Sequence, residues 1–539
     1  MKTLWKMLMM VRESYPRGFF MRIVYVFFQS LLPLANLYVL KLLVDSITRR
    51  DMGDAMLYVA VFVAVLFSHR LVSTLSGVNN DILSQRLIDY VSDKIQRQSS
   101  RLDMSYYDNP TYHDTFHRAQ QEASYRPLEV LNNAMTLVGS ALSLAGVAAL
   151  LASLSPWVVP VLVLSVTPMF VVRLVKSRRL YLFRRENTQT YRRTSYYAAL
   201  LTQRDYAKEL RMYGLAPYFR KLFVEIRHGL VGKILTISRR LAYYDALCAV
   251  VEAAALAVVL MLFVGGAYRG AFSIGSFVML FEAFRRGQGH LMSLVASVAG
   301  LYDTRLFAGN LMEFLALNPR VVSPAEPEPM PEKIESVEFR DVTFRYADMS
   351  RDVISHFSLM AKTGEVCKIE GENGCGKSTL MKLLMRLYDP DEGAIYINGT
   401  DIRRFDLVAL RRSQGVLFQD FVRYYFTAGE NIAFGDMEQG YDEARVREAA
   451  AKSGADEVVV RLDERYDTML GRMFDGGEEL SMGQWQRLAL ARLFYSDAPV
   501  MILDEPTAWM DQKTRQHFYS VLDELKKDRV VFLIRHSEK

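Results

Sequence analysis

The chain has 539 residues, 51% of them hydrophobic, a formal net charge of +6 and three cysteines. This length exceeds what one hydrophobic core supports, so two or more domains are expected. The cysteines (Cys248, Cys367 and Cys375) are few and far apart, which excludes a disulfide framework and a cysteine metal site. A basic balance is typical of nucleic-acid binding or of cytoplasmic loops in a membrane protein. Long apolar runs favour the second, and we expect no nucleic-acid partner.

Residues 1–318 contain six apolar runs, each long enough to cross a membrane as a helix of about 20 residues. The expected spans are 19–44, 55–78, 132–153, 156–175, 243–266 and 273–300. The segments 79–131 and 176–240 are long and rich in Lys and Arg. Because positively charged loops stay on the cytoplasmic side, the sequence predicts a multi-pass protein of the cytoplasmic (inner) membrane, surrounded by lipid. Both termini and the domain after the last span are expected in the cytoplasm.

The two long segments contain few helix breakers, and we expect them to extend the spans as long intracellular helices. Each should reverse once through a short connecting helix, for which Tyr106 to Ala119 and Leu200 to Phe219 are the candidates. The expected fold of residues 1–318 is therefore an all-α polytopic membrane domain with six transmembrane helices.

Several ionisable residues fall inside the expected spans. Charges at this depth are costly and usually functional. We expect a polar layer facing the interior of the helix bundle, with Glu252 opposite an arginine and Glu282 paired with Arg286 at i, i+4. The alternative is that the span ends lie a few residues away and that these charges sit at the cytoplasmic interface.

Residues 319–331 combine five prolines with acidic residues, which predicts a linker that is neither helical nor packed. Residues 332–539 are expected to form a second, α/β domain. The alternation of apolar and polar residues from Ile334 to Tyr346 predicts strands of a small antiparallel sheet. Because the chain ends three residues after His536, we expect a short C-terminal edge.

A phosphate-binding loop is the strongest motif of the second domain. The stretch Gly371 to Thr379 fits G-x-x-x-x-G-K-[ST], with a strand expected before it and a helix after it. Backbone N–H groups of such a loop point at phosphate oxygens. Lys377 would neutralise phosphate charge and Ser378 would ligate Mg²⁺. The residues expected to hold the phosphates are Gly371, Asn373, Gly374, Gly376, Lys377, Ser378 and Thr379.

Two carboxylates follow the apolar run Val500 to Leu503, which is expected to be a buried strand. Asp504 would hold Mg²⁺ through its coordination shell. Glu505 is placed to take a proton from, or to orient, an attacking water molecule.

The stretch Leu480 to Gln484 (Leu-Ser-Met-Gly-Gln) opens a helix and resembles the L-S-G-G-Q signature of ABC ATPases, with Met482 in place of the first glycine. The resemblance covers the whole chain. Six spans before one nucleotide domain resemble an ABC exporter half-transporter joined to an α/β P-loop ABC ATPase domain. The stretches 419–424, 427–432 and 207–211 look like those of the bacteriocin and lantibiotic peptide exporters.

This resemblance implies ATP and Mg²⁺ as cofactors and assigns further roles. Tyr346 would stack on adenine, and Gln419 would sense Mg²⁺ as a metal ligand beside Ser378 and Asp504. Glu505 and His536 would be the catalytic residues, with His536 at the γ-phosphate. The residues that would bind nucleotide across a dimer are Ser481, Gly483, Gln484 and Asp511.

The resemblance further implies ATP-driven export by alternating access, in a dimer of half-transporters, with a peptide as the favoured substrate. The alternatives are a lipid or drug flippase and a non-transporting, ATP-gated ABC regulator. The intact Glu505 and His536 argue against the regulator. Met482 and Trp509 alter the parts that act on the partner's nucleotide, as in a heterodimer with one weak site, but a homodimer is favoured.

Overall fold

The computed structural model describes residues 2–108, 116, 126–154, 156–347, 349–372 and 374–536. The chain divides into two compact units. The first, the helical unit, comprises Met1–Ser100 and Asp114–Leu317. The second, the α/β unit, comprises Asn318–Lys539 together with the segment Arg101–His113, called the 101–113 segment below. The expected combination of an all-α domain and an α/β domain is confirmed.

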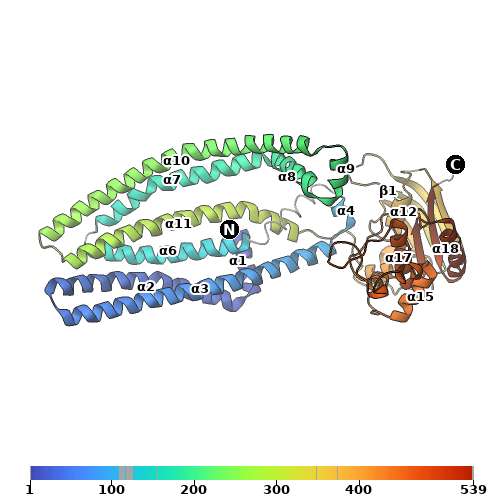
Figure 1. Ribbon diagram of the computed structural model, residues 1–539, viewed down its shortest axis with the longest axis horizontal. Helices are drawn as coiled ribbons and strands as arrows, with labels where there is room; N and C mark the ends of the chain where they lie inside the picture. The colour runs from blue at the N-terminus through green and yellow to red at the C-terminus, as the bar shows by residue number, and fades with distance from the viewer. Residues whose placement is uncertain are drawn as a thin grey trace. The chain divides into compact units, whose positions relative to one another are not determined.

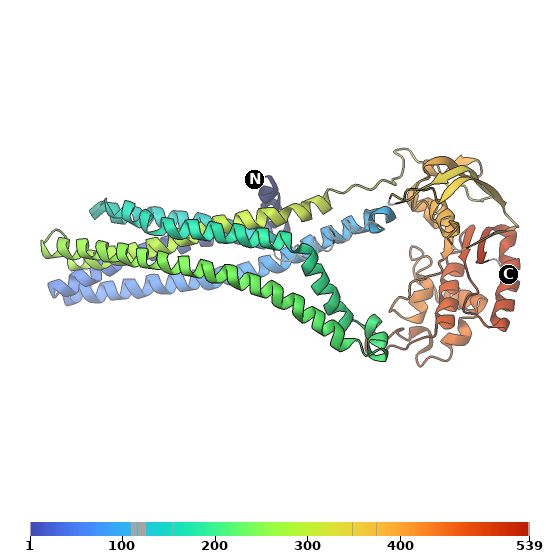
Figure 2. The ribbon, with the colours of Figure 1, turned by 90° about the horizontal axis from the view of Figure 1, so that it is seen from above.

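The described part of the helical unit is built from α-helices of very different lengths. They are α1 (Lys2–Ser14), α2 (Pro16–Arg49), α3 (Met52–Arg101), α6 (Arg126–Leu154), α7 (Val158–Glu186), α8 (Thr188–Thr202), α9 (Ala207–Met212), α10 (Ala216–Tyr268) and α11 (Ile274–Leu315). Figures 1 and 2 show α6 lying along α11, and α7 along α10.

Five helices among the described residues are long and apolar enough to cross a membrane: α2, α3, α6, α7 and α10. The expected sixth span, 273–300, lies in α11, which is not among these five. This helix carries three charged residues, Glu282, Arg285 and Arg286, in its first four turns. Each expected span lies on one helix, except that α7 begins two residues after the expected start at 156 and α11 one residue after the expected start at 273.

Proline and glycine chemistry sets several helix ends. Pro16 and Pro217 lie in the first turns of α2 and α10, where the fixed φ of proline favours a helix start. The expected connecting helix over 200–219 is shorter than predicted. It consists of α9 and a preceding 3₁₀ turn, because the left-handed Gly214 ends it and Pro217 starts the next helix. The other expected connecting helix, Tyr106 to Ala119, lies mostly outside the described residues. Its described start is α4 (Met104–Tyr107).

The expected charge layer of the membrane helices is present only in part. Glu282 accepts hydrogen bonds from Arg285 at 2.9 Å and from Arg286 at 3.0 Å, and Arg286 also donates to the Pro33 carbonyl at 3.2 Å. Within the described part of the chain, no arginine forms an ion pair with Glu252. The predicted pair of Glu282 and Arg286 is confirmed. The predicted pair of Glu252 with an arginine is not formed among the described residues.

The α/β unit contains two four-stranded sheets. The antiparallel sheet has the order β2-β1-β4-β5, and the parallel sheet has the order β3-β8-β7-β6. The strands are β1 (Ser336–Phe344), β2 (Ile354–Lys362), β3 (Val366–Gly371), β4 (Glu392–Ile397), β5 (Thr400–Asp401), β6 (Gln414–Leu417), β7 (Val500–Asp504) and β8 (Val530–His536). The helices are α4, α12 (Lys377–Leu384), α13 (Leu407–Arg412), α14 (Ala428–Ala433), α15 (Glu443–Ser453), α16 (Asp456–Val459), α17 (Met482–Tyr495) and α18 (Gln512–Leu525).

The parallel strands place chemistry at one edge of their sheet. Central strand β7 is buried along Val500–Leu503, and its apolar side chains pack into the core on both faces. Buried parallel strands are near-continuous apolar runs for this reason. The carboxyl ends of β3, β7 and β8 meet at the same edge, where Gly371 pairs with His536 and Asp504 with Ile534.

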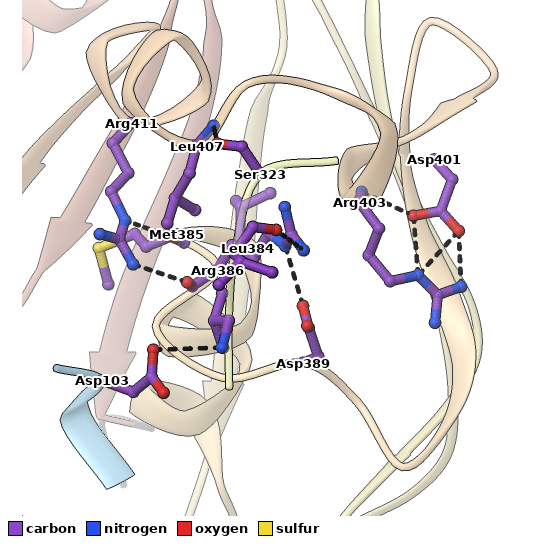
Figure 3. A network of polar contacts seen from close by, with 12 residues as sticks. Asp103, Ser323, Leu384, Met385, Arg386, Asp389, Asp401, Arg403, Leu407 and Arg411 are labelled. Carbon is purple, nitrogen blue, oxygen red and sulfur yellow. Dashed lines mark hydrogen bonds and ion pairs between the residues drawn. The ribbon is translucent and has the colours of Figure 1, made fainter. Parts of the chain in front are cut away.

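The linker after α11 is not helical, but it is packed, which differs from the expectation. Asp103, a buried carboxylate of the 101–113 segment, accepts hydrogen bonds from the backbone N–H groups of Arg320 and Val321. Buried Arg386 donates to the Val322 carbonyl at 3.0 Å and to Asp389 at 3.0 Å (Figure 3). Buried polar groups are usually hydrogen-bonded, and here their partners come from different segments. These contacts therefore join the 101–113 segment, the linker and the α/β core.

The Asp103 contact predicts a local loss of protection. In Asp103→Ala, the Arg320 and Val321 N–H groups lose their acceptor, which costs about 1–3 kcal/mol for a buried group and corresponds to about tenfold or more in opening. Hydrogen exchange of residues 318–323, measured by mass spectrometry on the purified chain, should accelerate accordingly. Asp401→Ala is the control, because Asp401 pairs locally with Arg403 in the same view (Figure 3). Equal exchange in both variants would contradict the assignment.

Candidate functional site

The phosphate-binding loop has the predicted strand–loop–helix context, with β3 before it and α12 after it. Gly374 and Gly376 have φ values of +81° and +96°, which residues with a side chain rarely adopt. A Cβ on Gly376 would also lie 2.5 Å from the Ile354 side chain. The loop is thus shaped around its glycines. Asn373, the remaining expected loop residue, lies outside the described residues.

Lys377 is the first residue of α12 and is 8% exposed. Its Nζ donates to the carbonyl oxygens of Gly371 at 2.5 Å and Glu372 at 3.0 Å. The ammonium therefore lies inside the loop, surrounded by acceptors. It is positioned to exchange these carbonyls for phosphate oxygens, which bind an ammonium more strongly because they are charged.

The two predicted carboxylates lie opposite this loop. Ser378 Oγ donates to Asp504 Oδ2 at 3.1 Å, and Gln419 Nε2 donates to Glu505 Oε2 at 3.0 Å. Glu505 has a left-handed φ of 49°, a strained conformation for a residue with a side chain. Its backbone N–H is held by the Ile534 carbonyl at 3.2 Å. The strand end therefore turns sharply and presents the two carboxylates at different angles.

A cavity of about 780 Å³ joins these groups. It is lined by nine of the predicted residues: Tyr346, Gly374, Gly376, Lys377, Ser378, Thr379, Gln419, Asp504 and Glu505. The Tyr346 hydroxyl lies 3.1 Å from Thr379 Oγ1, and its ring packs edge-on against Phe344 and Tyr388. Gly371 lies at the base of the loop, outside the cavity lining.

Three of the residues expected to act across a dimer, Ser481, Gly483 and Gln484, lie outside the lining of this cavity, at the start of α17. Ser481 caps the helix: Gln484 N–H donates to its Oγ at 3.4 Å, and Ser481 N–H donates to Gln484 Oε1 at 2.8 Å. Such a capping box fixes the helix N-terminus. A Cβ on Gly483 would lie 2.6 Å from the Trp509 carbonyl, so only glycine fits there. Met482 is exposed, with its Sδ 3.9 Å from Arg423 Nη1.

Asp511 and His536 complete the predicted set. Asp511 caps α18 by accepting the Thr514 N–H at 2.7 Å, and this bond lowers the pKa of the Asp511 carboxyl. His536 ends β8, where its backbone pairs with Gly371 of the phosphate-binding loop. The sheet register thus brings His536 to the same edge as Asp504, whereas Asp511 and the start of α17 lie outside the cavity lining.

Gln486 is a site residue that the sequence did not identify. It is 3% exposed on α17; its Nε2 lies 3.4 Å from the Glu505 carbonyl, and its Oε1 accepts the Trp509 N–H at 3.2 Å. The Gln486 side chain therefore connects α17 to both ends of the loop from Glu505 to Trp509. The sequence signal that could have identified Gln486 was a polar glutamine among the mostly apolar buried residues of α17.

The cavity fits a nucleotide with a magnesium ion. No three His, Cys, Asp or Glu side chains converge on a metal site within the described ranges. Magnesium, however, is usually held by one or two carboxylates together with substrate phosphates and water. Ser378, Gln419 and Asp504 line the cavity beside the loop and match such an incomplete donor set.

Known proteins resemble both the α/β unit and the whole chain. A family model described as ABC transporter matches residues 354–508. The solved structure of a bacterial Atm1-family ABC exporter with ATP bound superposes with a TM-score of 0.80, covering 96% of this chain and 90% of that one, at 22% identity. At this identity the likeness concerns the fold.

Sequence relatives span nearly the whole chain. The subtilin transport ATP-binding protein SpaT of Bacillus subtilis is 28% identical over 526 residues, covering 96% of this chain and 85% of the relative. The nisin transport ATP-binding protein NisT of Lactococcus lactis subsp. lactis is 26% identical, covering 94% and 85%. An ATP-dependent lipid A-core flippase of Syntrophus aciditrophicus is 34% identical over 259 residues, covering 48% and 41%.

Proposed function

This chain is an ABC transporter of the exporter type with its own ATPase domain, and on that premise we propose that it exports a peptide across the cytoplasmic membrane. The observation that carries the proposal is the likeness to the subtilin and nisin transport proteins over 85% of their length, which includes the membrane helices. Membrane helices carry substrate preference, whereas the ATPase domain is shared with transporters of many cargoes.

We propose that ATP and Mg²⁺ bind in the cavity of about 780 Å³. Tyr346 would stack on the base, and the loop from Gly371 to Thr379 would hold the phosphates. Ser378, Gln419 and Asp504 would hold Mg²⁺, which supplies charge neutralisation at the transferring phosphoryl group. Glu505 would accept the proton of the attacking water, and His536 would contact the γ-phosphate side.

A second copy would complete the site. Ser481, Gly483, Gln484 and Asp511 lie outside the cavity, so they would act on nucleotide held by a partner. The fixed N-terminus of α17 is suited to this, because helix N-termini bind anions. ATP would thus hold two half-transporters together, and hydrolysis would release them and move the membrane helices. Both termini would lie in the cytoplasm.

Stimulation of the ATPase tests the cargo class. In proteoliposomes containing the purified chain, a peptide of the subtilin or nisin kind should raise ATP turnover and enter the lumen in an ATP-dependent manner. The runner-up is a lipid flippase, which the lipid A-core flippase relatives favour. Lipid-stimulated turnover with transbilayer movement of lipid, and no response to peptide, would replace our proposal with that one.

We propose a homodimer, which makes a prediction about Met482. Its side chain lies against Arg423, an arrangement that supports access of Ser481 and the Gly483 N–H to a partner's nucleotide. The purified chain alone should hydrolyse ATP, and Met482→Gly should raise turnover severalfold by restoring close approach. Met437→Gly, at another exposed methionine, is the control. A chain that binds ATP but hydrolyses it only with a second half-transporter would indicate a heterodimer.

A further inference from the structure

Helices α2, α6 and α11 pack against one another in the helical unit and leave a polar cavity of about 170 Å³ between them. Seven of its ten lining residues are polar: Arg22, Gln29, Ser30, Thr136, Ser140, Ser143 and His290. A polar cavity within membrane helices is costly unless something occupies it, because unsatisfied polar groups lose hydrogen bonds to water.

The cavity contains one cationic side chain and several polar groups without a protein partner among the residues that the structure describes. Arg22 donates through Nη1 to Ser76 Oγ, but its Nε is buried and has no acceptor within the described residues. Gln29, Ser140 and His290 likewise have no hydrogen-bond partner in the part of the chain that the structure describes. No Asp or Glu lines the cavity. A guanidinium with no carboxylate among the described lining residues favours a ligand that brings anionic oxygens, and the neutral side chains can donate to the same oxygens.

The depth of the cavity follows from a contact at the other end of the same helices. Asp45 of α2 accepts hydrogen bonds from Ser273 Oγ at 2.9 Å and from Gly275 N–H at 3.0 Å, which places the outer ends of α2 and α11 side by side. At about 1.5 Å per residue, Ser30 lies about 22 Å below Asp45, and His290 about 24 Å below Ile274. Both counts agree, and both lie in the inner half of a hydrocarbon core of about 30 Å.

Arg22 marks the lower end of the cavity. It lies about 35 Å below Asp45 by the same count, just beyond the hydrocarbon core and at the depth of inner-leaflet phosphates. Helix α1 supports this level, because it buries Met7 and Val11 while exposing Trp5, as an interfacial helix does. If both termini lie in the cytoplasm, as proposed above, the Arg22 guanidinium lies at the depth of the inner-leaflet phosphates. The serine-lined part of the cavity then lies deeper in the membrane.

We propose that this cavity binds the head group of an anionic phospholipid from the inner leaflet, with the phosphate on Arg22 and head-group or ester oxygens on Gln29, Ser140 and His290. The volume of about 170 Å³ suits one phosphate and its neighbouring glycerol, not a peptide. Basic pockets between membrane helices on the cytoplasmic side recognise head groups in this way. The bound lipid would fill the junction of α2, α6 and α11.

Native mass spectrometry of the full chain in detergent, titrated with short-chain phosphatidylglycerol, tests the site. One phosphatidylglycerol per chain should be retained, with affinity about tenfold weaker in Arg22→Gln and unchanged in Arg17→Gln. Arg17 is exposed near the start of α2 and carries the same charge outside the cavity. Ser140→Ala, which removes a buried hydroxyl with little change in volume, should weaken retention about threefold and serves if Arg22→Gln does not fold.

Each competing ligand has its own outcome. Equal retention of phosphatidylcholine would overturn the preference for an anionic head group. Displacement by excess inorganic phosphate would identify a free-anion site, and displacement by a short acidic peptide would identify a cargo site; either result would overturn the lipid proposal. Unaltered binding in both Arg22→Gln and Ser140→Ala would place the lipid elsewhere. None of these readouts requires ATP or transport, so they are independent of the export proposal.

Discussion

Glu505→Gln should retain ATP and lose turnover by about 10²–10⁴-fold, the range that a general base contributes. The substitution removes the proton acceptor but keeps the size of the side chain and its ability to bind Gln419, whose amide lies 3.0 Å from Glu505 Oε2. The strained turn at Glu505 is held by backbone contacts to Ile534 and Gln486, which the substitution leaves intact. ATP should therefore accumulate in a closed dimer.

The measurement is steady-state phosphate release by the purified chain, together with size-exclusion chromatography in the presence of ATP and Mg²⁺. Glu443→Gln makes the same chemical change at an exposed ion pair with Arg447 on α15 and should hydrolyse ATP normally. Turnover of Glu505→Gln within twofold of the unaltered chain would exclude Glu505 as the base.

Lys377→Ala should weaken ATP binding by about 10–100-fold. A charge-assisted hydrogen bond contributes about 1.5–3 kcal/mol, and this ammonium is largely buried at the base of the cavity. Unlike Glu505→Gln, this variant should fail to retain nucleotide at concentrations that saturate the unaltered chain. The two variants therefore separate binding from the chemical step.

Equilibrium binding of a fluorescent ATP analogue measures this effect. Lys377 also holds the Gly371 and Glu372 carbonyls, so thermal melting without nucleotide must accompany the titration to detect loop unfolding. Lys368→Ala, at an exposed lysine of β3, should change neither measurement. Unchanged ATP affinity in a folded Lys377→Ala chain would remove Lys377 from the phosphate site.

Local patterns in the sequence predicted much of the lining of the candidate nucleotide cavity, and the family resemblance added Tyr346 and Gln419. The loop glycines, Lys377 and Ser378 form one turn and the helix after it, and Asp504 and Glu505 end one buried strand. Their geometry follows from a few consecutive residues and from the rule that carboxyl ends of parallel strands share an edge. The pair of Glu282 and Arg286 was predictable for the same reason, since i, i+4 residues are neighbours on a helix.

Contacts between distant parts of the chain were not predictable. Asp103 meets the backbone of Arg320, 217 residues away, and no periodicity indicates such a pairing. The prolines of the linker correctly indicated an absence of helix, but they gave no sign that buried Arg386 would bind its backbone. Arg22 fell inside the expected first span, 19–44, and its surroundings were not predictable, because the helices that line its cavity come from three separate segments.

The packed linker changes how this protein should be dissected. A soluble fragment that begins at residue 332, after the prolines, would omit Asp103, Val321 and Val322 and leave the Arg386 guanidinium without its Val322 acceptor. A fragment that begins at residue 318 and is supplied with a peptide of residues 101–113 would restore them. We therefore expect that a stable isolated ATPase fragment needs two pieces, residues 101–113 and the chain from residue 318 onward.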